Sequence, residues 1–449
     1  MMVDLSCLAL ALFAVVGAAL AQPLEGAMPV RVTGEWSVEV GPGSVRIQGV
    51  SIDLVEAVRL DVPPGELVEI TGERHEELRV FNPDVSGWRK GDRLRALVTQ
   101  ECSATGKLVP ESLAVRPAAD GAPYVLDTDY AFDPFWGTFG RIEGAAILAE
   151  QEVFVDYTYG PDRLDSIVAN DQGQLRLIPG KPSVGAFPPP EPGEGETAIV
   201  NIWVPGRTTE LSDDNLYAIQ PLPEVAVEPT ADQLLPKTLA KLRAGEDVTI
   251  VAWGDSVTNG GGVGRANVPG WYQNQFATRL QARFPQANVK LITAAWGGRN
   301  SRRYMDQPRG AEKDFVRDVL DPKPDLVTIE FVNDAYLSEA QVKVHYDEIM
   351  GHMNGIEAEV ILITPHLVRP DWLGQDSMKF DEDPRPYVQA LKAYAAENGI
   401  ALADASALWC RLWRLGIPYM TLEANSINHP DEHGHKLFAD ALMAVFPEE

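Results

Sequence analysis

The chain has 449 residues, 45% of them hydrophobic and 8% aromatic, and its formal net charge is −27. This length exceeds that of one ordinary domain, so the composition predicts two domains with sizeable cores. The acidic charge disfavours nucleic acid as a partner, because nucleic-acid binding needs basic patches, and it also disfavours anionic membranes.

The chain opens with a stretch that resembles a targeting signal. Residues 5–20 are nearly all apolar, and Ala19-Leu20-Ala21 fits the small-x-small rule for cleavage. We therefore expect residues 1–21 to be a signal peptide and the mature protein to be secreted or periplasmic. The apolar run is shorter than the roughly 20 residues of a spanning helix, so we expect no membrane span after cleavage. An uncleaved anchor is the alternative.

Residues 28–220 are predicted to form a β-rich accessory domain. Short alternating runs separated by frequent Pro and Gly turns are typical of a β-sandwich or of two small β-modules. Strands are expected at Trp36–Val40, Val45–Gln48, Leu94–Thr99, Glu152–Tyr159 and Ala198–Val204.

One stretch of this region combines aromatic residues with carboxylates. Tyr130–Trp136 lies among Asp127, Asp129 and Asp133. Such a mixture can stack on a sugar ring and bond its hydroxyl groups, but a loop at the edge of the core is the favoured interpretation. Carbohydrate binding by the accessory domain is therefore a hypothesis only.

The pattern changes after a proline-rich linker at 221–237. Residues 238–449 alternate strands with helices, which predicts an α/β domain with a three-layer, doubly wound, five-stranded parallel sheet. Strands are expected at Val248–Trp253, Val289–Ala294, Leu326–Phe331, Val360–Thr364 and Ile400–Ala403. Helices are expected at Trp271–Phe284, Lys313–Leu320, Ser338–Asn354 and Tyr387–Glu397, and a last helix after His429-Pro430.

The ends of these strands carry the residues of acyl-transfer chemistry. Ser256 follows the first strand, and the second strand runs into the glycine pair of Ala294–Ser301. The third strand ends in Phe331–Asp334, and the chain closes with the histidine-containing stretch Asn425–His435. Active residues of such sheets gather at the carboxyl ends of the strands. A serine can attack a carbonyl while a histidine takes its proton and later protonates the leaving group. A glycine N–H and an asparagine amide can stabilise the oxyanion.

These four blocks, in this order, resemble the SGNH hydrolases, the GDSL-type esterase superfamily, over about residues 239–445. The resemblance implies a flavodoxin-like fold and a nucleophile at Ser256, within Gly-Asp-Ser-Val. It implies oxyanion donors at Gly298 and Asn333 and a catalytic base at His429, within His-Pro-x-x-x-Gly-His. No cofactor is implied, and the β-rich half is not covered.

The sequence departs from the family at one position. The family usually carries Asp three residues before the histidine, where this chain has Ser426, or Asn425 if one residue is inserted. Neither is a carboxylate, and loss of the orienting acid can cost a factor on the order of 10⁴ in rate. A backbone carbonyl, a hydroxyl or a carboxylate from elsewhere can orient His429 instead, and Glu423 and Asp404 are the candidate carboxylates.

Two further features have simpler explanations than a ligand site. The acidic and histidine residues between His429 and His435 could bind a metal, but Asp431 and Glu432 suit the start of a helix, so no metal is expected. Cys102 and Cys410 are the cysteines of the mature chain, and they lie in different predicted domains. Two free buried thiols are expected rather than a disulfide.

The sequence therefore predicts a secreted serine esterase that hydrolyses short-chain, acetyl-type esters on a carbohydrate. The substrate would be a small-molecule or polysaccharide ester. A lipid or lysophospholipid esterase is one alternative, and a catalytically impaired carbohydrate-binding protein is another. The particular sugar, the regioselectivity and the oligomeric state are not predicted.

Overall fold

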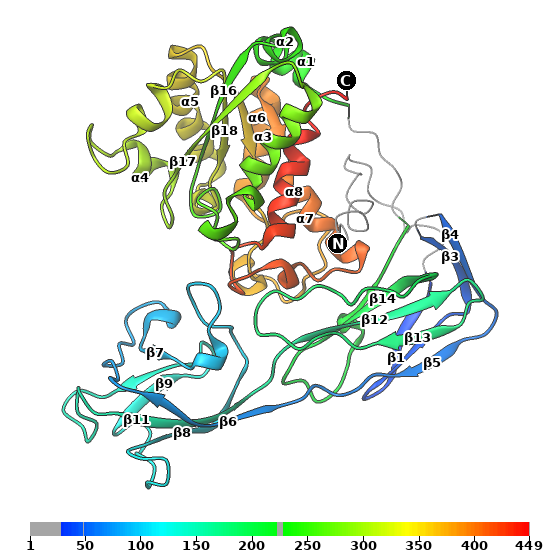
Figure 1. Cartoon of the computed structure of the whole chain (residues 1–449), viewed down its shortest axis with the longest axis vertical. Coiled ribbons are helices and arrows are strands. Elements are labelled where there is room, and N and C mark those ends of the chain that lie inside the picture. The colour runs from blue at the N-terminus through cyan, green and yellow to red at the C-terminus, as the bar shows by residue number, and fades with distance from the viewer. Residues whose placement is uncertain (1–27, 48, 222–227, 449) are drawn as a thin grey trace, which may run out of the picture. The chain divides into compact units, whose positions relative to one another are not determined.

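The computed structural model describes residues 28–47, 49–221 and 228–448 (Figure 1). The expected signal peptide at 1–21 lies outside these ranges and stays a prediction. Within the described ranges, no helix is both long enough and apolar enough to cross a membrane.

Contacts divide the described residues into two compact units. An α/β unit comprises residues 228–412 and 428–448, and a β-rich unit comprises residues 28–221 and 413–427. The second unit therefore includes a short C-terminal segment, 413–427, that the sequence grouped with the α/β domain.

The α/β unit is built on one parallel sheet with the strand order β17-β16-β18-β19-β20. Figure 1 labels β17, β16 and β18 of this sheet. All residues of β18 are buried, as expected for a strand that is covered on both faces. Each strand overlaps one expected from the sequence, which confirms the predicted five-stranded sheet. The bounds are β16 (Asp247–Gly254), β17 (Asn288–Ala295), β18 (Leu326–Glu330), β19 (Glu359–Ile363) and β20 (Ala401–Ala403).

Helices form the two outer layers of this unit. α5 and α6 pack over the sheet face that carries Val251 and Trp253. α3 packs against α8, where the rings of Tyr272 and Phe438 lie 5.4 Å apart. The bounds are α1 (Ala231–Leu234), α2 (Pro236–Ala244), α3 (Tyr272–Arg283), α4 (Ser301–Met305), α5 (Glu339–Gly355), α6 (Pro386–Asn398), α7 (Ala405–Arg411) and α8 (Glu432–Met443).

The β-rich unit contains two separate cores. One core includes Val40 and Ile202 and belongs to the sheets β1-β2-β5, β3-β4 and β13-β12-β14-β15. The other includes Phe139 and Val155 and belongs to the sheets β6-β11-β8 and β7-β10-β9. The strand bounds are β1 (Val30–Gly34), β2 (Ser37–Val40), β3 (Gly43–Ile47), β4 (Val50–Leu54), β5 (Val58–Asp61), β6 (Val68–His75), β7 (Asp92–Arg93), β8 (Leu108–Arg116), β9 (Tyr130–Asp133), β10 (Thr138–Arg141), β11 (Val153–Tyr159), β12 (Arg163–Asn170), β13 (Leu175–Ile178), β14 (Glu196–Val204) and β15 (Leu216–Ala218).

The strand expected at Leu94–Thr99 is wrong. The segment forms a 3₁₀ turn at Arg95–Leu97, closed by a hydrogen bond of 3.0 Å from the Leu97 N–H to the Leu94 carbonyl. Leu94 and Leu97 are both fully buried. Their spacing of three residues matches a 3₁₀ turn, whereas a strand would need a period of two.

Hydrogen bonds explain why residues 413–427 belong to the β-rich unit. The Asn201 amide donates to the Gly416 carbonyl at 2.8 Å, and the Phe187 N–H donates to the Thr421 carbonyl at 3.0 Å. The Cys102 thiol donates to the Asn425 carbonyl at 2.8 Å. These bonds join residues far apart in sequence, so no local pattern could have revealed them.

Two smaller expectations can be compared with the structure. Cys102 and Cys410 are buried thiols that form no disulfide, which confirms the prediction.

In the aromatic stretch, Tyr130 is buried, and Asp133 accepts the N–H groups of Phe135 and Trp136 at 3.0 Å each. Tyr130–Asp133 is strand β9 rather than a loop, and Asp133 at its end organises the turn that follows.

Candidate active site

Ser256 lies in a tight turn directly after β16. A Cβ atom at Gly254 would lie 2.0 Å from Thr258 Oγ1 and 2.4 Å from the Glu330 carbonyl oxygen, so only glycine fits there. The turn closes through the N–H of Gly261, which donates to the Ser256 carbonyl at 2.8 Å. Ser256 itself is half-buried. The strand end thus presents its hydroxyl from a rigid support.

Asp255 connects the serine turn to Asn333. Its carboxylate is fully buried and accepts the Asn333 backbone N–H at 3.0 Å and the Asn333 side-chain amide at 2.8 Å. It also accepts the Val257 N–H at 3.1 Å. An asparagine amide has two hydrogens. The bond to Asp255 uses one of them, so the Asn333 amide is held in place with its second hydrogen available to a ligand.

Two more carboxyl groups lie buried near Asp255. Burial raises the pKa of Asp255 to about 6, and hydrogen bonds from Asn333 and Val257 oppose that rise. Burial and the Asp255 charge raise the pKa of Glu330, whose side chain contacts Thr258 at 3.3 Å, well above its ordinary value. Burial also raises the pKa of Asp334 to about 7.

Gly298 lies beside the serine turn at the end of β17. The Trp296 N–H donates to the Gly254 carbonyl at 3.1 Å, which aligns the loop after β17 with the loop after β16. A Cβ atom at Gly297 would lie only 3.6 Å from Ser256 Cβ. Gly298 follows with φ of +69°, a conformation that favours glycine. The structure therefore places the glycine pair next to Ser256.

His429 lies against the same turn. The His429 side chain is 5% exposed. A Cβ atom at Gly261 would lie 3.0 Å from His429 Cγ and 3.1 Å from His429 Cδ2. Since the Gly261 N–H also bonds the Ser256 carbonyl, this one residue touches both the serine segment and the histidine ring. The site residues expected from the sequence are thus gathered around one turn.

The candidates for orienting His429 lie in different surroundings. The Ser426 hydroxyl donates to the Val184 carbonyl at 3.2 Å, and the Asn425 side-chain oxygen accepts the Ile427 N–H at 2.9 Å. Asp404 caps α7 by accepting the Ala407 N–H at 3.2 Å, and it pairs with Lys392. Glu423 is fully buried.

The histidines near the C-terminus have separate structural partners. Asp431 caps α8 by accepting the Gly434 N–H at 2.9 Å, and His433 lies 3.3 Å from the Asp431 carboxylate. His435 is buried and bonds main-chain groups. Among the residues that the structure describes, no cluster of three or more His, Cys, Asp or Glu side chains could hold a metal ion.

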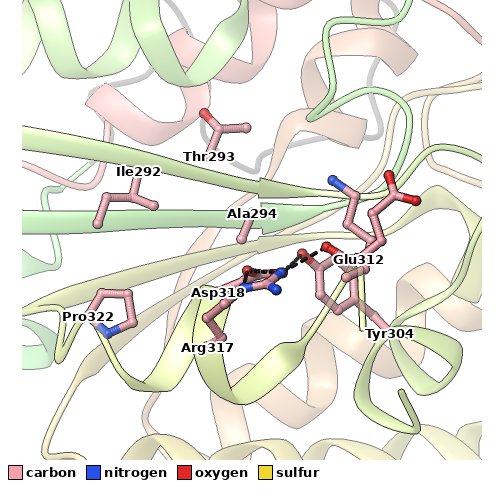
Figure 2. A pocket seen from close by; sticks show the side chains of 9 residues that line it. Ile292, Thr293, Ala294, Tyr304, Glu312, Arg317, Asp318 and Pro322 are labelled. Atoms are coloured by element: carbon pink, nitrogen blue, oxygen red, sulfur yellow. Dashed lines mark hydrogen bonds and ion pairs between the residues drawn. The ribbon is translucent and has the colours of Figure 1, made fainter. Parts of the chain in front are cut away.

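A cavity of about 230 Å³ lies away from these groups, at the edge strand β17 (Figure 2). None of Ser256, Gly298, Asn333 and His429 lines it. Its polar groups bond one another, since Asp318 accepts from Tyr304 at 3.0 Å and from Arg317 at 2.7 Å (Figure 2).

Sequence reasoning missed several residues that support the site. Asp255 stands beside Ser256 in the sequence, but no pattern there indicates its bonds to Asn333, and Glu330 reads only as the end of a strand. His366 follows β19 without a motif around it, and the pattern around His435 suggests only a metal ligand or a helix start.

Comparison with known proteins identifies a family for part of the chain. The GDSL-like lipase/acylhydrolase family matches residues 252–437. No curated protein matches the chain. Among solved structures, a two-domain esterase (CEX) active on acetylated mannans is 20% identical, with a TM-score of 0.38. The match covers 49% of this chain and 53% of that one, so this chain spans about half the length of that esterase.

Two further solved structures are similar over a smaller share of this chain. Axe2, an acetylxylan esterase from Geobacillus stearothermophilus, is 20% identical, with a TM-score of 0.36. The match covers 44% of this chain and 95% of that one. LAE5, an α/β hydrolase from the metagenome of Lake Arreo, Spain, is 22% identical, with a TM-score of 0.34. The match covers 44% of this chain and 94% of that one.

Proposed function

We propose that the α/β unit, whose residues 252–437 match the GDSL-like lipase/acylhydrolase family, hydrolyses carboxylic esters with Ser256 as nucleophile and His429 as base. The observation that carries the proposal is Gly261, which bonds the Ser256 carbonyl and packs against the His429 ring. A serine and a histidine brought to one turn at the carboxyl end of a buried strand suit acyl transfer.

The reaction proceeds through an acyl-enzyme. Ser256 Oγ forms a bond to the ester carbonyl carbon while His429 accepts the hydroxyl proton, and the carbonyl oxygen becomes an oxyanion. When the oxyanion collapses, the bond to the alcohol breaks and His429 protonates the departing oxygen. Water then attacks the acyl group with His429 again as base, which releases the acid and restores Ser256.

The oxyanion is bound by the Gly298 N–H and the Asn333 amide. Asn333 is suited to this role because Asp255 holds its amide before substrate arrives, so little reorganisation accompanies charge development. Gly298 is suited because a residue without a Cβ leaves its N–H open to the developing charge.

We further propose that the substrate is a short-chain, acetyl-type ester on a carbohydrate. The residues around the oxyanion glycine offer an aromatic and polar rim. The Arg299 guanidinium lies 5.2 Å from the centre of the Trp296 ring, and Tyr336, which is 59% exposed, accepts a hydrogen bond of 3.1 Å from Asn300. Aromatic faces with nearby donors suit a sugar better than a long acyl chain. Export of the mature chain, implied by residues 1–21, agrees with a polysaccharide substrate.

Two measurements test the function. Purified enzyme and its Ser256→Ala variant are assayed on p-nitrophenyl esters of increasing acyl length and on acetylated oligosaccharides. We expect turnover that is highest for acetyl, lost in the variant, and accompanied by labelling of Ser256 with a fluorophosphonate probe. Equal activity in Ser256→Ala would refute the serine mechanism.

The same assay distinguishes the alternatives. A maximum at long acyl chains would indicate a lipid or lysophospholipid esterase. Absence of turnover with retained sugar binding would indicate a catalytically impaired binding protein. That alternative has one supporting observation, since Ser426, which stands at the usual acid position, directs its hydroxyl to the Val184 carbonyl.

A further inference from the structure

A second histidine lies buried behind His429. His366 follows β19, is 0% exposed, and its Nε2 lies 2.8 Å from the carbonyl oxygen of Asn428, the residue before His429. A carbonyl only accepts, so Nε2 carries the proton. Its ring packs against Trp409 at 5.3 Å and Phe438 at 5.8 Å between ring centres.

Hydrogen bonds from Arg385 fix the backbone around His366. Arg385, which is 8% exposed, donates to the carbonyl oxygens of Pro365 at 2.9 Å and of His366 at 2.7 Å, and it pairs with the buried Asp383. Burial, and next the Arg385 charge, lower the pKa of His366 well below its ordinary value. His366 is therefore a neutral donor on a rigid support.

A third histidine, His435, approaches the site from α8. Its Nδ1 accepts the Tyr272 N–H at 3.1 Å, and its Nε2 lies 2.8 Å from the Gly261 carbonyl oxygen. These two main-chain partners allow one tautomer only, with the proton on Nε2. Burial lowers the pKa of His435 to about 4, so this ring is also neutral.

We propose that His366 and His435 are positioning residues that hold Ser256 and His429 in their positions relative to one another. His366 acts through the Asn428 carbonyl and so orients the peptide that leads into His429. His435 acts through Gly261, which bonds the Ser256 carbonyl and packs against the His429 ring. The inference rests on the proposed function, because it assigns these residues a role only if Ser256 and His429 do the chemistry.

The charge state of these donors suits the reaction. His429 becomes a cation when it takes the serine proton. A lysine or arginine donor at the same positions would repel that cation and oppose the proton transfer. A neutral imidazole supplies the same hydrogen bond without that repulsion.

The test compares variants that keep or lose one hydrogen bond. Glutamine can place an N–H near the position of imidazole Nε2, whereas asparagine can place its oxygen near Nδ1 but cannot reach with the donor. We therefore expect His366→Phe and His435→Asn to lower kcat on p-nitrophenyl acetate about 10- to 100-fold, the loss typical of misplaced groups. His366→Gln and His435→Gln should recover most of the rate, and KM should change little in all four.

Two further measurements distinguish a positioning role of these histidines from a general loss of protein stability. The thermal midpoint and the pH profile of kcat/KM are measured for each variant. We expect His366→Phe to shift the acid limb of that profile, which reports the pKa of His429, and a purely structural role would not shift it. Wild-type kcat in folded His366→Phe and His435→Asn would overturn the proposal, as would equal losses in the Gln variants.

One measurement uses the unaltered enzyme and does not depend on variant folding. In ¹⁵N-histidine NMR near pH 7, His366 and His435 should both show neutral rings protonated on Nε2. Titration of either ring near its ordinary pKa would overturn the proposal. Failure of the proposed function gives a different result, either hydrolysis that persists in Ser256→Ala or no ester hydrolysis by the wild-type enzyme.

Discussion

The substitution Gly261→Ala tests whether one glycine holds the serine and the histidine together. Gly261 has no positive φ, so alanine can adopt its backbone conformation, and only the added Cβ matters. That atom would lie 2.8 Å from the Ser256 carbonyl oxygen and 3.0 Å from His429 Cγ. Non-bonded carbon atoms prefer about 3.5–4.0 Å. The ring must therefore move by about half an ångström or more, or the turn must open.

The expected magnitude follows from this overlap. Overpacking of a dense site typically costs about 1–3 kcal/mol of unfolding free energy. Misplacement of a catalytic group by up to about 1 Å can lower the rate by about 10²-fold. We expect Gly261→Ala to lower the unfolding free energy by about 1–3 kcal/mol. We expect kcat on p-nitrophenyl acetate to fall about 10- to 100-fold, with a smaller change in KM.

A matched control uses a glycine with free space around it. Gly351 lies inside α5, and nothing lies within 4 Å of the Cβ that alanine would add there. Gly351→Ala should leave kcat unchanged and raise stability by about 0.5–1 kcal/mol, because glycine weakens helix interiors. Wild-type kcat in Gly261→Ala, with an unchanged thermal midpoint, would refute the packing argument.

Three further predictions concern Asn333, Asp255 and Cys102. Asn333→Ala should lower kcat about 10²–10³-fold with little change in KM, and a change in KM alone would reassign the amide to ground-state binding. The pKa of Asp255, raised to about 6, means that the folded state holds the proton more tightly than the unfolded state, so stability should fall as pH rises from about 4 to about 6. Denaturant unfolding should show a loss of stability over this pH range that is smaller in Asp255→Asn than in the wild type by about 3 kcal/mol. Cys102→Ala removes the thiol donor to the Asn425 carbonyl and should lower the unfolding free energy by about 1–3 kcal/mol, whereas Cys102→Ser should cost less, and equal effects would argue against that bond.

The β-rich unit has a structural role that the label of accessory domain does not convey. It holds residues 413–427, and the next residue along the chain after this segment is Asn428, followed by His429. Removal of residues 28–220 would leave the carbonyl groups of Gly416, Thr421 and Asn425 without the bonds described above.

The sequence alone determined the α/β architecture and the candidate chemistry. The runs that form β16 to β20 are short, apolar and separated by helical periods, so local pattern is enough to identify them. Ser256, the glycine pair and Asn333 follow from this order, because parallel strands bring their carboxyl ends to one edge. The resemblance to the SGNH hydrolases, carried by short motifs, selected Gly298 and His429.

Only the tertiary structure decided how these residues are held. The bond from His366 to the Asn428 carbonyl, the bond from His435 to the Gly261 carbonyl, and the bond from Cys102 to the Asn425 carbonyl each join distant parts of the chain. Hydrogen bonds to main-chain carbonyls cannot be predicted from residue types, because every residue supplies the same acceptor. The partners of a buried histidine or thiol are therefore set by packing, which local periodicity does not encode.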